Sequence, residues 1–99
     1  MSGAGALRTR LCIAADHPSL PGHFPGRPVV PGVVLLDRIA ALIEQGGAGR
    51  LARLEVVKFL APVLPGQACE CVVERDAARV RFELVRDGAC VLRGSGTLA

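Results

Sequence analysis

Residues 17 to 37 contain the side chains of this sequence best suited to proton transfer: His17, His23 and Asp37. An imidazole has an unperturbed pKa of about 6.5, so neutral histidine can remove a proton near pH 7. An aspartate carboxyl has a reference pKa of about 3.9, so it keeps a proton to donate only in apolar surroundings. Residue type alone does not distinguish His17 from His23, and the surrounding elements must decide between them.

A stiff loop and a helix contain these side chains. Residues 17–31 include five prolines and two glycines, which exclude regular structure and favour an extended loop that can fix a side chain. Residues 33–45 contain neither Pro nor Gly, and their apolar side chains cover most of a helical circumference. We therefore predict a helix that is enclosed on nearly every side. Its apolar members expected to surround Asp37 are Val34, Leu35, Leu36 and Ile39.

Alternating residues predict a strand near residues 7–14, and four later segments, bounded by Gly, Pro and turn residues, also read as strands. The predicted strands are 7–14, 51–60, 67–75, 78–86 and 89–98. Asp87-Gly88 joins the last two as a tight hairpin, because both residue types tolerate a positive φ. One helix among antiparallel strands predicts an α+β fold, a curved antiparallel sheet wrapped around one long central helix. We expect residues 1–6 to be a flexible tail and residues 7–99 to form one domain.

Two longer motifs carry a more specific signal. The first reads Gly-His-Phe-Pro-Gly-Arg-Pro-Val-Val-Pro-Gly-Val over residues 22–33 and continues as Val-Leu-Leu-Asp over 34–37. The second combines Val-Lys-Phe at 57–59 with Pro-Val-Leu-Pro-Gly at 62–66. Both resemble the 3-hydroxyacyl-(acyl-carrier-protein) dehydratases of type II fatty-acid synthesis. With the matching order of elements, the resemblance covers nearly all of residues 7–98.

The resemblance implies a hot-dog fold and a homodimer in which a histidine meets a Glu or Asp from the central helix of the other subunit. His23 and Asp37 fall at these two positions, 37 − 23 = 14 residues apart. His17 is then a surface residue. Gly32 matches the glycine whose backbone N–H polarises the thioester carbonyl. The predicted substrate-binding residues are Gly32, Val33, Phe24 and Pro31.

The implied reaction needs these residue types. Elimination of water from a (3R)-3-hydroxyacyl thioester removes a proton α to the carbonyl and protonates the departing hydroxide at the β carbon. We predict His23 as the base and Asp37 as the acid that together give the trans-2-enoyl thioester. Negative charge that develops on the thioester oxygen would meet the N–H groups of Gly32 and Val33 at the start of the helix.

Departures from the family pattern keep other functions open. Members of the family carry Gln four residues after the acid, where this sequence has Ala41, and most have an additional N-terminal segment. The short chain resembles the small stand-alone proteins of aryl-polyene and polyketide-type synthesis. Asp37 could instead belong to a solvated stripe with Arg38, Glu44 and Gln45. The alternatives are a hot-dog acyl thioesterase, or a non-catalytic partner that binds acyl carrier protein or a longer homologue.

The composition of the chain favours some classes of binding partner over others. With three aromatic residues and a net charge of +3 spread over interleaved arginines, the chain suits an acidic protein such as acyl carrier protein better than nucleic acid. It has no run of eighteen apolar residues, and arginines at 8 and 10 interrupt any signal peptide, so we expect a cytoplasmic protein without membrane attachment.

The four cysteines do not have the spacing of a metal or redox site. Cys12, Cys69, Cys71 and Cys90 form no Cys-x-x-Cys pair, and each falls in a predicted strand. We therefore interpret them as small buried hydrophobic residues in a reducing compartment. We expect no metal and no cofactor.

Overall fold

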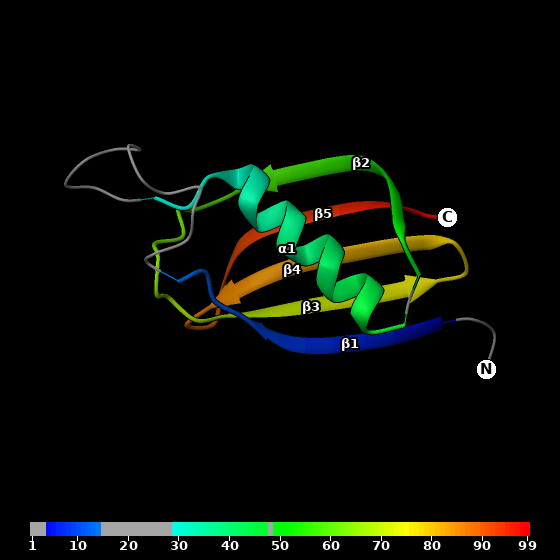
Figure 1. Ribbon diagram of the computed structural model, residues 1–99, viewed down its shortest axis with the longest axis horizontal. Coiled ribbons are helices and arrows are strands. Elements are labelled where there is room, and N and C mark those ends of the chain that lie inside the picture. Colours follow the sequence, from blue (N-terminus) through cyan, green and yellow to red (C-terminus); the bar gives the residue numbers. More distant parts are fainter. Residues whose placement is uncertain (1–3, 15–28, 48) are drawn as a thin grey trace.

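The computed structural model describes residues 4–14, 29–47 and 49–99, which form one helix and one five-stranded sheet (Figure 1). The elements follow the predicted order: β1 (Ala4–Leu11), α1 (Gly32–Gln45), β2 (Leu51–Phe59), β3 (Cys69–Asp76), β4 (Arg79–Arg86) and β5 (Ala89–Leu98). The strands lie in the order β1-β3-β4-β5-β2, and all neighbouring pairs are antiparallel. The predicted α+β hot-dog architecture is therefore confirmed.

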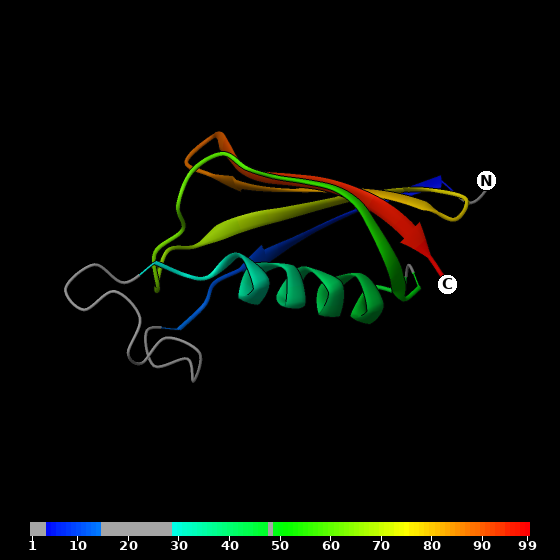
Figure 2. The ribbon, with the colours of Figure 1, turned by 90° about the horizontal axis from the view of Figure 1, so that it is seen from above.

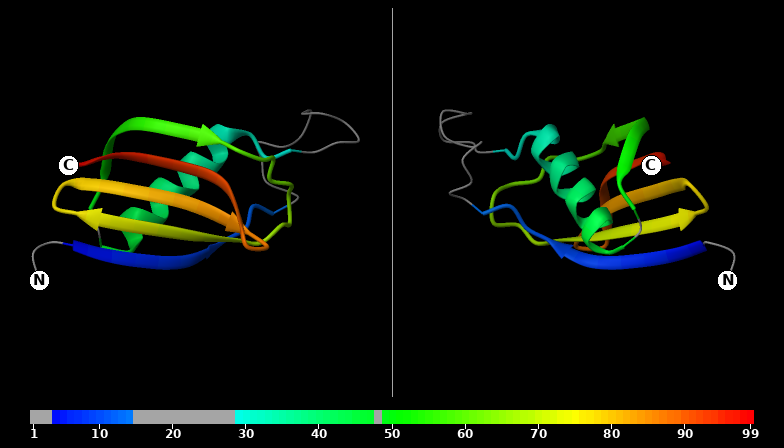
Figure 3. Two further views of the ribbon diagram at one scale, coloured as in Figure 1. Left: turned by 180° about the vertical axis from the view of Figure 1, so that it is seen from behind. Right: turned by 45° about the vertical axis from the view of Figure 1, so that its right-hand side comes forward.

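The helix lies on one face of the sheet. Because α1 connects β1 and β2, the two edge strands, it crosses that face from one edge to the other. Figure 2 shows the two layers from above, and Figure 3 shows the open outer face and the helix from further sides. No helix in the described part of the chain is long and apolar enough to span a membrane.

The core fills the space between α1 and the sheet. Alternate residues of the strands point into it, as the burial pattern of β3 shows with Cys69, Cys71 and Val73. The helix contributes four buried side chains: Val34, Leu35, Ile39 and Ile43. No charged or polar side chain is buried among the described residues.

The prediction that the helix is enclosed on nearly every side is wrong for the single chain. Val33, Asp37, Arg38 and Glu44 are exposed. One sheet can cover only one side of a helix, so complete enclosure would need a further layer. The high apolar content of α1 thus exceeds what its own sheet requires.

β1 begins and ends three residues earlier than predicted. The small residues 4–6, assigned from the sequence to the tail, pair with Asp76, Arg75 and Glu74 of β3. Their lack of large apolar side chains hides the alternation by which a strand is detected. Cys12 consequently lies beyond the end of β1 rather than within a strand. Residues 4–6 therefore belong to β1 rather than to the predicted tail of residues 1–6, and residues 1–3 lie outside the described residues.

Two tight hairpins connect β3, β4 and β5. In the second, Asp87 and Gly88 have φ of 51° and 80°, the two positive values of a type I′ turn, which confirms the predicted hairpin. In the first, Ala77 and Ala78 join β3 to β4, and Ala77 has a φ of 54°. An alanine Cβ disfavours this left-handed conformation by about 1–2 kcal/mol.

We expect Ala77→Gly to raise the free energy of unfolding by about 0.5–1 kcal/mol, because glycine removes the strain at positive φ and returns only part of it as unfolded-state entropy. Urea unfolding with an unchanged m value measures the difference. Ala78→Gly is the control, since Ala78 does not have a positive φ and the change should be neutral or destabilising. Equal stability of the two variants would refute the strain at residue 77.

Candidate active site

The first turns of α1 contain most of the described candidate residues. Pro31, Gly32 and Val33 lie at the start of the helix, and Asp37 follows within it. His23 and Phe24 lie outside the described residues, as does His17. The roles assigned to those three therefore stay predictions.

Pro31 is the N-cap of α1 and leaves the end of the helix open. Its φ of −59° and ψ of 143° place its carbonyl oxygen to accept bonds from the N–H groups of Val34 at 3.0 Å and Leu35 at 3.3 Å. The N–H groups of Gly32 and Val33 precede these bonds, so the helix itself offers them no acceptor. No side chain in the described part of the chain caps this end, and the first turn contains no acidic residue. Two N–H donors and the positive end of the helix dipole thus favour a developing negative charge.

Asp37 is exposed in the single chain, and the predicted apolar surroundings do not form there. It lies five residues beyond Gly32, about 7.5 Å along the helix axis. Successive residues turn by about 100°, so Leu35 and Ile39 each lie about 200° away from Asp37 around the helix. Both pack into the core under the sheet. The expected enclosure of Asp37 by Leu35 and Ile39 is therefore wrong for the single chain, because helix geometry directs both to the opposite face.

The exposure of Asp37 fits both interpretations of its role. Arg38, Glu44 and Gln45 are exposed as well, as a solvated polar stripe requires. A carboxyl at an exposed position could also be covered by a second subunit. Only a functional measurement distinguishes the two.

Phe59, at the end of β2, covers the start of α1. A Cβ built on Gly32 would lie 2.7 Å from both Cε1 and Cζ of the Phe59 ring, so the ring rests directly on the glycine. Phe59 is 54% exposed and Val33 is 72% exposed. An exposed apolar rim therefore adjoins the two free N–H groups. The sequence did not predict this contact, and the only signal for it was the position of Phe59 within the second motif.

We expect Gly32→Ala to lower the free energy of unfolding by about 1 kcal/mol, the lower end of the cost of overpacking, because the exposed Phe59 ring can move aside. Phe59→Ala removes the ring, and in that background the same Gly32→Ala change should cost less than about 0.3 kcal/mol. Urea unfolding of the four proteins of this double-mutant cycle measures the coupling. Equal costs in both backgrounds would show that the ring does not rest on Gly32.

β2 is an edge of the sheet that lacks a covering layer. Seven of its nine residues are exposed, and Leu54 and Val56 expose 42% and 50% of their surface. The apolar exposure continues beyond the strand at Leu60, which is 51% exposed. A long exposed apolar edge strand pairs readily with another chain. The exposed apolar surface along β2, beside the start of α1, is thus suited to binding another protein chain.

Cys69, Cys71 and Cys90 lie in environments that lower thiol reactivity. Burial raises the pKa of the Cys71 thiol to about 11, and burial is also the main cause of the raised pKa of Cys69 and of Cys90. These thiols therefore stay protonated and weakly nucleophilic at neutral pH. Cys69 and Cys71 are buried as predicted, whereas Cys12 and Cys90 are only partly buried. Among the described residues, no three His, Cys, Asp or Glu side chains form a cluster that could bind a metal.

The sequence matches a family of dehydratases. The model of the ApeI-like family, described as ApeI dehydratase, matches residues 2–95. The 3-hydroxyacyl-[acyl-carrier-protein] dehydratase FabZ of Thermus thermophilus is 41% identical over 64 residues, 54% of this chain and 45% of that protein. The FabZ of Erwinia tasmaniensis is 29% identical over 103 aligned positions, 93% of this chain and 64% of that protein. The chain thus spans about half to two thirds of the length of these curated relatives.

A solved structure has the same fold. The dehydratase heterocomplex ApeI:P from Xenorhabdus doucetiae matches with a TM-score of 0.80 and 22% identity, over 93% of this chain and 85% of that chain. At this identity the likeness concerns the fold alone. It agrees with the single helix against a five-stranded antiparallel sheet.

Proposed function

The chain belongs to the ApeI-like dehydratase family, and from this membership we propose that it is a (3R)-3-hydroxyacyl-acyl-carrier-protein dehydratase. The observation that carries the proposal is the open start of α1, where the N–H groups of Gly32 and Val33 lie about one to one and a half turns before Asp37. This arrangement places donors for an oxyanion and a proton-transfer group on one helix. The reaction is the elimination of water from the 3-hydroxyacyl thioester to give the trans-2-enoyl thioester.

The proposed mechanism uses two proton transfers. Neutral His23 removes a proton from the α carbon, and the electron pair of that C–H bond forms the new double bond to the β carbon. The C–O bond at the β carbon breaks, and the departing hydroxide takes a proton from the Asp37 carboxyl to leave as water. The proton on His23 then returns to Asp37 through solvent, which restores both groups. The two proton transfers as written require no metal and no cofactor.

The N-terminus of α1 supplies the electrostatic part of the mechanism. As the α proton leaves, negative charge moves onto the thioester carbonyl oxygen. The N–H groups of Gly32 and Val33 donate to that oxygen, and the helix dipole stabilises it further. Pro31 and Phe24 would border the same acyl thioester. Phe59, which lies on Gly32, adds an apolar surface for the acyl chain.

The proposed enzyme works as a homodimer that pairs through β2. Its exposed edge, with Leu54 and Val56, supports this arrangement, as does the exposed face of α1. Closed two-fold pairing would bring the helix of one subunit towards the other, and that second layer would cover Asp37. The Xenorhabdus dehydratase forms a heterocomplex. Pairing of this chain with a homologue is therefore the alternative outcome when the oligomeric state is measured.

The proposed substrate is an acyl chain on acyl carrier protein, the carrier in the names of the FabZ relatives. The net charge of +3 suits an acidic protein partner such as acyl carrier protein. The cytoplasmic location stays a prediction from the sequence.

Incubation of the purified chain with a 3-hydroxyacyl thioester tests the proposal directly. We expect absorbance of the conjugated enoyl thioester to rise without release of free thiol. Thiol release without enoyl product would identify a thioesterase. If neither product forms but the chain still binds acyl carrier protein, the chain is a non-catalytic partner. The departure from the family pattern at Ala41 was the first indication of this alternative.

A further inference from the structure

The β2–β3 loop, residues 60–68, binds both ends of the chain segment that contains His23. The N–H of Val30 donates to the carbonyl oxygen of Val63 at 2.8 Å, and the N–H of Gly66 donates to the carbonyl oxygen of Ile13 at 2.8 Å. Ile13 immediately precedes residues 14–29, and Val30 immediately follows them. Val30 is also only two residues from Gly32, so the same loop fixes the entry to α1.

Arg86, at the end of β4, connects the β2–β3 loop to the sheet through hydrogen bonds. Its Nη1 donates to the carbonyl oxygen of Pro62 and, at 2.9 Å, to Oε1 of Gln67. The same Oε1 of Gln67 accepts the N–H of Leu64 at 2.9 Å, so one amide oxygen joins Arg86 to the turn of the loop. Pro62 and Gln67 lie on either side of Val63, whose side chain is 2% exposed. The guanidinium thus braces the part of the loop that carries the Val63 acceptor.

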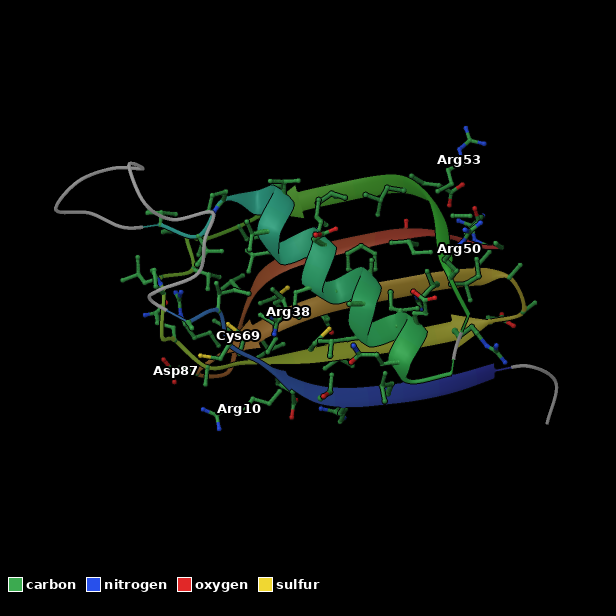
Figure 4. All side chains as sticks on the ribbon, viewed as in Figure 1. Arg10, Arg38, Arg50, Arg53, Cys69 and Asp87 are labelled. Atoms are coloured by element: carbon green, nitrogen blue, oxygen red, sulfur yellow. The ribbon has the colours of Figure 1, made fainter. Side chains whose placement is uncertain are left out.

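The end of β4 lies at the same end of the molecule as the start of α1 (Figure 1). Figure 4 shows Asp87, which follows Arg86, at the same end as Cys69 and the beginning of the helix, whereas Arg50 and Arg53 lie at the opposite end. Arg86 is only partly exposed, so its hydrogen bonds compete less with water than those of a fully solvated arginine.

We propose that Arg86 is a positioning residue of the dehydratase site. Through the β2–β3 loop it fixes the two ends of the segment that carries His23 and the N–H groups at the start of α1. It touches none of the reacting atoms. The inference rests on the proposed function for its effect on turnover, but not for its effect on the loop.

The chemistry of arginine explains why this residue type is needed. A guanidinium presents several N–H donors in a rigid planar fork and remains charged at every relevant pH, so it can bond a backbone carbonyl and a side-chain amide together. A lysine ammonium can reach such acceptors but lacks the fixed geometry. Gln67 must only accept, so glutamate can replace it whereas leucine cannot.

Amide hydrogen exchange tests, without any substrate, whether Arg86 holds the β2–β3 loop in place. In Arg86→Leu we expect the amides of Val30 and Gly66 to exchange about tenfold faster or more, because the loop that holds their bonds opens locally. The amide of Leu84, in the central strand β4, should keep its rate. Gln67→Leu should reproduce the effect, and Gln67→Glu should not. Unchanged exchange of Val30 and Gly66 in a folded Arg86→Leu protein would overturn the proposal, whatever the activity.

Kinetics with a 3-hydroxyacyl thioester test the effect on turnover. We expect kcat of Arg86→Leu to fall about 10- to 100-fold, the scale of a small displacement of catalytic groups, while KM changes less than about threefold. Arg86→Lys should recover part of the loss. Millimolar guanidinium chloride should also restore part of the activity of Arg86→Leu, and sodium chloride at the same concentration should not. A change in global stability alone would produce neither rescue.

Arg81→Leu is the matched control, because Arg81 lies on the same strand and, among the residues that the structure describes, makes only an exposed ion pair with Glu74 at 4.0 Å. It should match the wild type in exchange and in kcat. Faster exchange in Arg86→Leu with wild-type kcat would overturn the positioning role. An inactive wild type would count against the dehydratase assignment instead, and the exchange rates would then decide whether Arg86 braces the loop.

Discussion

Replacing Asp37 by Asn should lower kcat about 100-fold or more, because the amide keeps the shape of the side chain but has no proton to give the departing hydroxide. The loss should fall mainly on kcat, since the carboxyl acts in the transition state rather than in binding. The rate of absorbance increase from the enoyl thioester, measured at saturating substrate, gives this value. Stability should change little because Asp37 is exposed in the single chain.

Glu44→Gln is the control for this experiment. Glu44 is an exposed acid on the same helix, and the substitution makes the same chemical change. Wild-type kcat is expected for it. If Asp37→Asn also retained near-wild-type kcat, Asp37 would belong to the solvated polar stripe with Glu44, and another group would have to supply the proton.

Mixing two inactive variants should restore activity to about a quarter of the wild-type value. His23→Ala and Asp37→Ala homodimers should each be nearly inactive. After equal mixing and subunit exchange, half of the dimers are hybrids, and each hybrid has one site with His23 from one chain and Asp37 from the other. Its second site has both alanines. One site in four is therefore complete, and the same enoyl assay measures the recovery.

Subunit exchange must be established separately, by mass spectrometry of dimers in which one variant is isotopically labelled. Sedimentation of the wild type at micromolar concentration should show a dimer. Confirmed exchange without recovery would mean that His23 and Asp37 do not meet across an interface. A monomeric wild type would exclude the composite site altogether.

Local sequence patterns were sufficient to predict the elements and their order. Local residue types and the Pro- and Gly-containing breaks between segments defined β2, β3, β4 and β5 to within two residues. The residue types of Asp87-Gly88 specified the turn between β4 and β5, because positive φ is a local property. The same reasoning missed the start of β1, where small residues carry no apolar signal. It also gave no warning of the positive φ at Ala77, since nothing in an alanine favours that conformation.

The sequence by itself determined which residues are candidates for the chemistry, because the motif at 22–37 places His23, Gly32 and Asp37 in a fixed order along one loop and one helix. Only the tertiary structure decided what surrounds Gly32 and Asp37. In the folded chain, apolar neighbours of Asp37 pack into the core, and the Phe59 ring lies on Gly32. Arg86 forms a hydrogen bond with the loop that also bonds to Val30. These contacts join segments far apart in the chain, and the periodicity of a helix or strand gives the face of a residue but not its partner across the fold.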